Sequence, residues 1–266
     1  MAPERLPVQD DNMSGRLQSI WRYPVKGFTP EPLDAALLTA GENFPCDRLY
    51  AVEDGPSGFD PAAPAHISKQ KFTVLAKIAR VAQVRTGFDE ASGIWTAEAP
   101  GHPGFRAEIT REAGRDAFAA WLTDVLAGDI AGPLKMLPAP DHHRFTDHPR
   151  GSVSIVNLAS VQALEARLGR PVDPRRFRAN LYVDGWPPWI ETEWPGRTLR
   201  VGPARLDVFS SIVRCVATHV DPDRGERDLD VTAGLYEGFG HILCGVYASV
   251  ARGGTIAPGD EVAPLP

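Results

Sequence analysis

A single cysteine in the second half of the chain is the residue best placed for chemistry. Cys215 follows an apolar, β-branched run from Leu206 to Val213 and precedes a turn rich in Asp, Pro and Gly, so we expect its thiol at a strand end facing a cavity. Arg214 before it and His219 after it would favour the thiolate, the form that attacks electrophiles or binds soft metals. Because free cysteine also packs frequently as a small hydrophobe, this stretch alone leaves function and core packing both open.

Several cations far apart in the sequence lie next to predicted strand ends or turns, where a β-rich scaffold exposes residues to a cleft. These cations are Lys26, Arg48, Arg178 and Arg214. With hydroxyls such as Ser152 and Ser154, they could hold a phosphate through charge-assisted hydrogen bonds. Asn180 adds an amide beside Arg178 at a predicted strand start. Each cation taken alone is more simply an exposed surface residue.

Missing motifs exclude several other kinds of site. The chain has no Walker phosphate loop, no Gly-x-Gly-x-x-Gly after a predicted strand and no Gly-x-Ser-x-Gly elbow. It has no Cys-x-x-Cys pair, which excludes zinc ribbons and protein-bound iron–sulfur clusters. Three histidines, His142, His143 and His148, fall in the irregular stretch 133–149 and indicate a solvated loop in preference to a metal site.

Composition indicates a β-rich globular protein. The 266 residues are 43% hydrophobic, and the 25 Gly and 25 Pro favour short strands joined by turns over long helices. A net charge of −6 argues against a nucleic-acid partner. The acidic start of the chain resembles no targeting peptide, and no apolar run approaches membrane-spanning length. Three widely spaced cysteines predict a reduced, cytoplasmic protein.

The elements that would position these residues can be outlined from periodicity. Strands are predicted over 16–23, 33–39 and 48–53, and a strand or pair of strands over 73–85. Helices are predicted over 110–128 and 157–168, where apolar stripes have helical spacing. From residue 199 onward the pattern predicts strands and turns alone. Arg176 and Arg178 would point the same way if they lay along a strand.

Ordered sequence motifs cover most of the chain. The N-terminal motifs are Tyr23-Pro24-Val25-Lys26, Leu38-Thr39-Ala40-Gly41, Phe44 and Asp47-Arg48. The later ones are Ser154-Ile155-Val156-Asn157, Arg176-Phe177-Arg178-Ala179-Asn180, Arg214-Cys215 with Thr218, Val220-Asp221-Pro222 and Gly225, and Gly253-Gly254-Thr255-Ile256 with Gly259-Asp260. Together these motifs resemble a known family, the MOSC (molybdenum cofactor sulfurase C-terminal) domain proteins with their N-terminal β-barrel module.

The resemblance implies an α+β, β-rich fold, with an N-terminal β-barrel-like module over 14–135, including a helix near 111–127, packed on a MOSC barrel over 136–266 with few short helices. It implies that molybdenum cofactor lies between the halves, that Cys215 ligates the metal, and that Lys26, Arg48 and Arg178 contact the pterin. Gly27 and Cys46 depart from the family pattern, which has Ser and Gly at these positions.

Similarity to the amidoxime-reducing components implies a molybdenum-dependent oxidoreductase that removes the oxygen from small N-hydroxylated substrates. Electrons would come from a separate ferredoxin or flavin reductase, and neither nucleic acid nor membrane is an expected partner. His219 is kept as a candidate proton donor. Two alternatives stay open: a non-catalytic molybdenum cofactor or sulfur carrier, and a metal-free thiol enzyme in which His219 activates Cys215.

Overall fold

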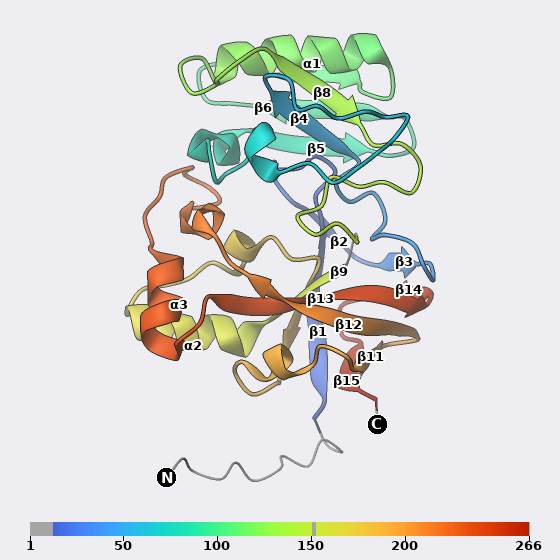
Figure 1. Ribbon diagram of the computed structural model, residues 1–266, viewed down its shortest axis with the longest axis vertical. Coiled ribbons are helices and arrows are strands. Elements are labelled where there is room, and N and C mark those ends of the chain that lie inside the picture. The colour runs from blue at the N-terminus through green and yellow to red at the C-terminus, as the bar shows by residue number, and fades with distance from the viewer. Residues whose placement is uncertain (1–12, 151–152, 266) are drawn as a thin grey trace.

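A computed structural model describes residues 13–150 and 153–265 of the chain. It has two lobes stacked along the long axis (Figure 1), with the stretch from β4 to β8 in one lobe and the first and last strands in the other. Ser152 lies outside the described residues. Within those residues, no helix combines the length and the apolarity needed to cross a bilayer.

A closed barrel of seven strands forms the larger lobe. In order around the barrel, these are β1 (Gly15–Arg22), β15 (Glu261–Pro264), β11 (Thr198–Val201), β12 (Ala204–Val213), β13 (Leu243–Arg252), β9 (Val153–Asn157) and β10 (Leu181–Asp184). The barrel closes where β10 pairs with β1, antiparallel. Along β12, Leu206 and Val208 point into the core while Arg205 and Asp207 face out, the alternation expected of a half-buried strand.

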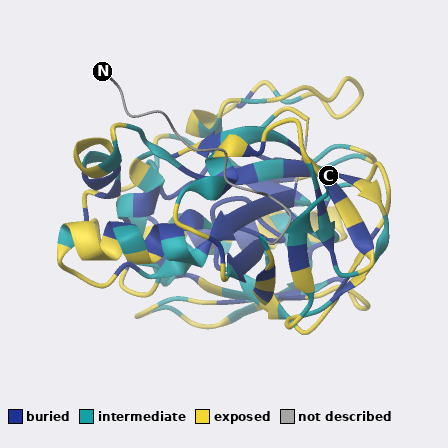
Figure 2. Ribbon diagram, turned by 90° about the horizontal axis from the view of Figure 1, so that it is seen from below, coloured by how far each residue is buried: buried dark blue, intermediate teal, exposed yellow. Residues whose placement is uncertain are grey.

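Two helices cover one side of the barrel. They are α2 (Leu158–Leu168) and α3 (Val231–Phe239), which bury Val161, Leu164 and Leu235 in a shared cluster. Helix α2 begins at the cap residue Asn157 and ends at Gly169, so the helix predicted over 157–168 is confirmed. Figure 2 shows the buried strands inside and the exposed residues on the helices and loops around them.

The second lobe is built from two small sheets and one helix. Strand β4 (Tyr50–Asp54) pairs with β8 (Leu134–Pro138), and β5 (Arg85–Asp89), β6 (Ile94–Glu98) and β7 (Phe105–Glu108) form an antiparallel sheet. Helix α1 (Glu112–Val125) confirms the helix predicted over 110–128 and packs Phe118 edge-on against Trp95, at 5.8 Å between ring centroids. The predicted division at residue 135 falls inside β8, so the domain boundary stays a prediction.

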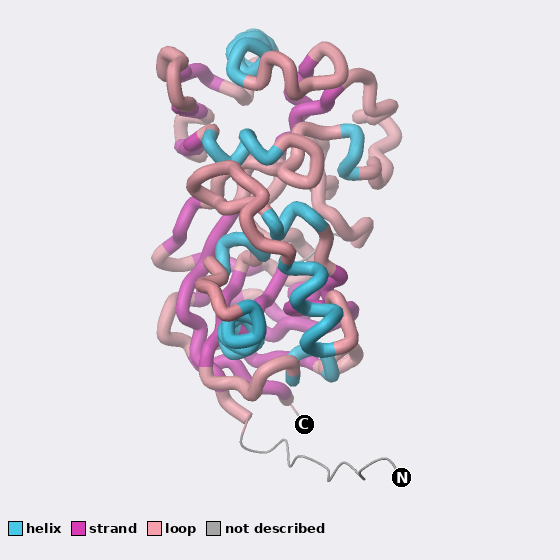
Figure 3. Tube along the Cα trace, turned by 90° about the vertical axis from the view of Figure 1, so that its left-hand side faces the viewer, coloured by secondary structure: helices cyan, strands magenta, loops and turns pink. Residues whose placement is uncertain are grey.

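Two further short pairs of strands join the segment that connects the lobes to the rest of the larger lobe. Strand β2 (Glu31–Leu33) pairs with β1, and β3 (Ala36–Leu38) pairs with β14 (Gly254–Ile256). Loops and short 3₁₀ turns occupy the region between the lobes (Figure 3). The predicted β-rich α+β architecture with a barrel and few short helices is confirmed.

The prediction of strands over 73–85 is wrong. This stretch forms turns and the 3₁₀ helix η3 (Ala79–Gln83). Its buried apolar residues Val74, Leu75, Ile78, Val81, Ala82 and Val84 follow turns and a short 3₁₀ helix, so neither a strand nor an α-helical period fits the whole stretch.

The prediction of strands and turns alone after residue 199 is also wrong, because α3 lies there. Gly234 and Gly238 lower its helix propensity. They are needed because α3 packs closely on α2: a Cβ at Gly234 would lie 2.6 Å from Leu168 Cδ2. Tertiary packing therefore overrides local propensity at this helix.

Candidate functional site

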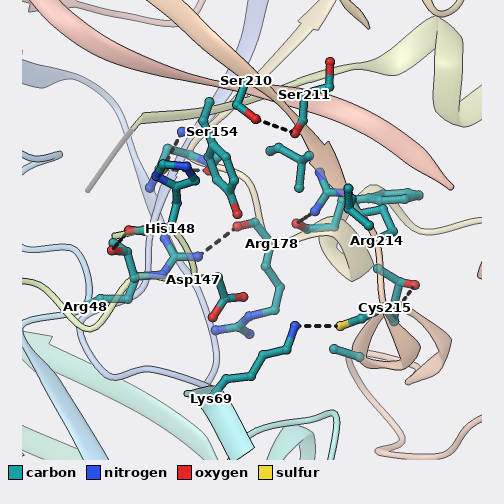
Figure 4. Close-up of a pocket in the computed structure, with 18 of the residues that line it drawn as sticks. Arg48, Lys69, Asp147, His148, Ser154, Arg178, Ser210, Ser211, Arg214 and Cys215 are labelled. Carbon is teal, nitrogen blue, oxygen red and sulfur yellow. Dashed lines mark hydrogen bonds between the residues drawn. The ribbon is translucent and has the colours of Figure 1, made fainter. Parts of the chain in front are cut away.

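A cavity of about 300 Å³ lies where the two lobes meet, and both lobes line it. Arg48, Lys69 and Asp147 come from segments outside the barrel strands, while Arg178, Arg214 and Cys215 come from loops at one end of the barrel (Figure 4). A smaller adjoining cavity of about 50 Å³ shares five of these six residues and adds Lys26. Lys26 and Arg214 are 188 positions apart in the sequence. The fold nevertheless brings all four predicted cations together beside Cys215.

Cys215 stands where β12 has ended and the 3₁₀ helix η6 (Val216–His219) begins, as the pattern predicted. Its carbonyl accepts hydrogen bonds from Thr218 N at 3.0 Å and Thr218 Oγ1 at 2.9 Å, which fixes the backbone at this turn. The thiol is partly exposed to the cavity, and Lys69 Nζ lies 3.2 Å from Cys215 Sγ. Lys69 thus brings a positive charge to a cysteine sulfur, which is a ligand that soft metals prefer.

Arg178 leaves the 3₁₀ helix η4 (Pro174–Phe177) in the left-handed conformation, with φ of 53°, so the strand expected for Arg176 and Arg178 is not formed. Arg178 Nη1 donates to Phe28 O at 2.8 Å, and its guanidinium lies 4.4 Å from the Tyr23 ring centroid. Arg178 Nη2 is buried and finds no acceptor among the described residues. The pKa of Arg178 is lowered to about 10, mainly by burial, and the nearby cation of Arg48 acts in the same direction.

Arg48 lies against the same tyrosine, 4.3 Å from the ring centroid. Its Nη2 donates to Arg178 O at 3.0 Å, and its Nη1 pairs with Asp47. Its backbone also has a positive φ, of 50°. Two guanidiniums held on one buried aromatic ring form a cationic wall of the cavity.

Lys26 and Asp147 form an ion pair at the smaller cavity. Lys26 is 5% exposed, and its Nζ donates to Phe145 O at 2.9 Å and to Asp147 Oδ1 at 2.5 Å. Burial lowers the pKa of Lys26. Burial raises the pKa of Asp147, but the Lys26 ammonium outweighs it and holds the Asp147 pKa well below its usual range. A half-exposed carboxylate thus sits where several cations meet.

Three other predicted residues line the cavity but use their polar groups within the protein. Arg214 is buried, and its guanidinium donates to Cys244 O at 2.7 Å and Phe177 O at 2.8 Å. Asn180 Oδ1 accepts from Ser154 N at 3.0 Å and from Ser154 Oγ at 2.8 Å. These contacts hold η4, β9 and β13 together around the cavity.

His219 is not among the described residues that line the cavity. Helix η6 turns its imidazole toward the start of α3, where Nε2 lies 2.9 Å from Thr232 Oγ1 and 3.3 Å from the Asp230 carboxylate. Burial lowers the pKa of His219. The structure gives no support to a proton-donor role for His219 or to its pairing with Cys215.

Sequence reasoning missed Lys69 and Asp147. Lys69 occurs in a polar Ser-Lys-Gln-Lys stretch and Asp147 in a loop with other charged residues, so neither differs locally from an ordinary surface residue. Although burial lowers the pKa of Lys69, the charges of Asp147 and Cys215 raise it overall. Only the fold shows that both residues line the same cavities as Cys215.

The cavity suits an anionic ligand that carries a soft metal. Cations surround it, the buried Nη2 of Arg178 has no acceptor within the part of the chain that the structure describes, and a partly exposed sulfur lies beside them. Guanidinium groups bind phosphates through directed hydrogen bonds, and a thiolate binds a soft metal. A pterin dithiolene with a phosphate and a bound molybdenum matches this donor set.

Comparisons with known proteins match two family models to this chain. A model of the MOSC N-terminal beta barrel domain matches residues 14–130, and a model of the MOSC domain matches residues 142–263. Mitochondrial amidoxime reducing component 2 of Macaca fascicularis is 26% identical over 179 residues, covering 57% of this chain and 52% of that protein. Mitochondrial amidoxime-reducing component 1 of Homo sapiens is 28% identical over 131 residues, covering 42% and 37%.

The chain thus matches about half, or less, of the length of these relatives. Among solved structures, the YUAD protein from Bacillus subtilis is similar with a TM-score of 0.45 and 14% sequence identity, over 95% of this chain and 96% of that one.

Proposed function

The chain belongs to the MOSC family, and we propose that it binds molybdenum cofactor in the cavity beside Cys215 and reduces N-hydroxylated compounds. The names of its relatives, which are amidoxime reducing components, support this reaction class. The observation that carries the proposal is the convergence of Lys26, Arg48 and Arg178 on the cavity that holds the Cys215 thiol.

Each of these residues has a distinct task in holding the cofactor. Cys215 would ligate molybdenum through Sγ. Arg178 would donate its unpaired Nη2 to an anionic oxygen of the cofactor, which would satisfy a donor that the protein leaves open. Arg48 and Lys26 would add positive charge. A contact between Lys26 and the ligand would replace part of the ion pair between Lys26 and Asp147. Arg214, Ser154 and Asn180 would shape the cavity through their contacts with the backbone.

The proposed reaction breaks an N–O bond. The N-hydroxylated substrate takes up two electrons and two protons, the nitrogen keeps one new hydrogen, and the oxygen leaves as water. When bound, the cofactor supplies the two-electron chemistry, and the chain positions it and sets its electrostatic surroundings. We propose a ferredoxin or flavin reductase as the electron donor.

Metal analysis and an activity assay test the proposal. Protein purified from a host that makes molybdenum cofactor is expected to contain molybdenum and, after oxidation, pterin fluorescence. Cys215→Ala is expected to lose most of the molybdenum. The wild type is expected to reduce an N-hydroxylated substrate with an artificial electron donor, and Cys215→Ala to lose this activity by at least about 100-fold.

The outcomes separate the alternatives. Molybdenum-free wild-type protein from that host would refute cofactor binding. Full molybdenum content without turnover of N-hydroxylated or N-oxide substrates would favour the carrier. All three cysteines are unpaired, which supports the proposed cytoplasmic location, since disulfides are rare there.

A further inference from the structure

One lysine reaches from the second lobe to the sulfur at the end of the barrel. Lys69 Nζ lies 3.2 Å from Cys215 Sγ, a contact between residues 146 positions apart, drawn as a dashed line in Figure 4. Both residues line the larger cavity and the smaller one. Among the described side chains, Lys69 is therefore the one that brings a positive charge into contact with Cys215 Sγ, the sulfur that we propose as the metal ligand.

The local fold holds Lys69 in this direction. It begins the 3₁₀ helix η2 (Lys69–Lys71), where Ser68 Oγ caps Gln70 N. Phe72, which follows, is buried and packs against Phe145 at 5.6 Å between ring centroids. Since residues two apart on so short a helix point in different directions, Lys69 faces the cavity while Lys71 is exposed to solvent.

From this geometry we propose that Lys69 is a positioning residue for the metal ligand: its ammonium donates a hydrogen bond to Cys215 Sγ, orients the sulfur and tunes the metal bound to it. The inference rests on the proposed binding of molybdenum cofactor. Groups that hydrogen-bond to metal ligands fix their orientation, and their loss typically costs about 10- to 100-fold in metal affinity or activity. Hydrogen bonds to ligating sulfurs also set reduction potentials.

The sign of the effect on the metal follows from charge. A cation beside the ligating sulfur stabilises the more electron-rich, reduced state of the metal. Removal of Lys69 should therefore shift the midpoint potential of molybdenum to lower values. A lysine that merely supported the fold would leave the potential unchanged in the protein that still binds cofactor.

Lys69→Met removes the charge at similar length, Lys69→Arg keeps it, and Lys71→Met is the matched control in the same helix. In the cofactor-loaded proteins, we would measure the molybdenum-to-protein ratio, the Mo(V) electron paramagnetic resonance spectrum and the midpoint potential. Lys69→Met is expected to bind less molybdenum, to change the spectrum and to have a lower potential. Lys69→Arg is expected to restore most of each property, and Lys71→Met to match the wild type.

A second readout needs no cofactor. In the apoprotein, neutral iodoacetamide at one fixed pH alkylates each cysteine at a rate that peptide mass spectrometry follows. Loss of Lys69 is expected to slow alkylation of Cys215 about fivefold or more, because its ammonium no longer holds the sulfur facing the cavity. Cys46 and Cys244 serve as internal references, since burial raises the pKa of each thiol to about 12.

The two readouts distinguish the two proposals. If wild-type protein binds no molybdenum but Lys69→Met still slows alkylation of Cys215, the cofactor proposal fails and the Lys69 contact stands. The Lys69 proposal is overturned if Lys69→Met alkylates at the wild-type rate, or if Lys71→Met slows alkylation equally. It is also overturned if loaded Lys69→Met has the wild-type spectrum and potential.

Discussion

Two arginines that line the cavity, two positions apart in the sequence, differ in how their terminal nitrogens are bonded. Arg176 is buried: its Nη2 pairs with Asp228 at 2.8 Å and its Nη1 donates to His219 O at 3.0 Å, while its Nε finds no acceptor among the described residues. Arg178 has a buried Nη2 without an acceptor among the described residues. The ion pair of Arg176 supports the fold, whereas the open Nη2 of Arg178 costs free energy that a ligand can recover.

Arg178→Met is therefore expected to lower cofactor content about tenfold and to change the unfolding free energy of the apoprotein by no more than about 1 kcal/mol. Arg176→Met is expected to destabilise the apoprotein by about 1–3 kcal/mol, because it removes the buried cation at Asp228 Oδ1 and leaves this carboxylate paired through Oδ2 with the exposed Arg224. Pterin fluorescence and urea unfolding of the two apoproteins measure these effects. Equal cofactor content in Arg178→Met and wild type would refute the assignment of Arg178.

At the level of single residues, the sequence marked cations that the fold brings together, but not all their neighbours. Lys26, Arg48 and Arg178 were marked by motifs at strand ends, and they line the cavities beside Cys215. Lys69 was missed because its contact with Cys215 depends on how the lobes meet, which local sequence does not encode. His219 is close to Cys215 in sequence but contacts Thr232, because closeness in sequence does not fix the direction of a side chain on a 3₁₀ turn.

Among the elements, one buried carboxylate ties three segments of the second lobe. Asp54 ends β4, and its carboxylate accepts from Lys77 Nζ at 2.8 Å, Ala131 N at 2.7 Å and Gly132 N at 2.9 Å. Burial raises the pKa of Asp54, but Lys77 and the two amides outweigh it and lower that pKa below its ordinary value. Since the folded pKa is depressed, the ionised carboxylate stabilises the fold above the unfolded pKa, and this contribution is lost as pH falls through the folded pKa.

Asp54→Asn is expected to lower the unfolding free energy by about 1–3 kcal/mol at pH 7 and to weaken its decline below about pH 4. Urea unfolding between pH 3 and about pH 7 measures both effects. Asp34→Asn, which changes an exposed carboxylate, is the control and should keep the wild-type pH profile. Parallel profiles for Asp54→Asn and wild type would contradict this account.

The elements were predictable where local signals agreed with packing. Helix α2 has both caps and an apolar stripe, so the sequence located it. Helix α3 was not predicted because it contains glycines, which allow its close contact with α2. The sequence of one segment does not show which element packs against it. The departure at Gly27 is explained by the fold: its φ is +91°, and a Cβ there would lie 2.4 Å from Thr73 O. At Cys46, where the family pattern has glycine, the chain keeps the left-handed backbone with φ of 52°.

For the molecule as a whole, side-chain contacts to backbone join the two lobes beside the cavity. Arg227 Nη2 donates to Leu75 O and Ala76 O, each at 2.9 Å, and Gln83 Nε2 donates to Arg224 O at 2.6 Å. A ligand held by residues of both lobes would add to these contacts. Its binding energy would then oppose separation of the lobes as well as unfolding.

Removal of the cofactor is therefore expected to lower the Tm by about 5 °C or more and to speed proteolysis between the lobes. Differential scanning calorimetry and limited proteolysis of loaded and cofactor-free protein measure this difference. Cys215→Ala from the cofactor-producing host should match cofactor-free wild type in both assays. If loaded and cofactor-free proteins unfold at the same temperature, the ligand does not bridge the lobes.

The closure of the barrel has a consequence for the order of events during synthesis. Strand β1 pairs with β10 and, through Gly15 and Val262, with β15, which the ribosome makes about 250 residues later. The start of β1 on this edge therefore stays unpaired until β15 has been made, and such an edge is prone to pair wrongly. The loops bearing Arg178 and Cys215 obtain their final positions only once this ring is complete. We expect cofactor insertion to follow the pairing of β15 with β1.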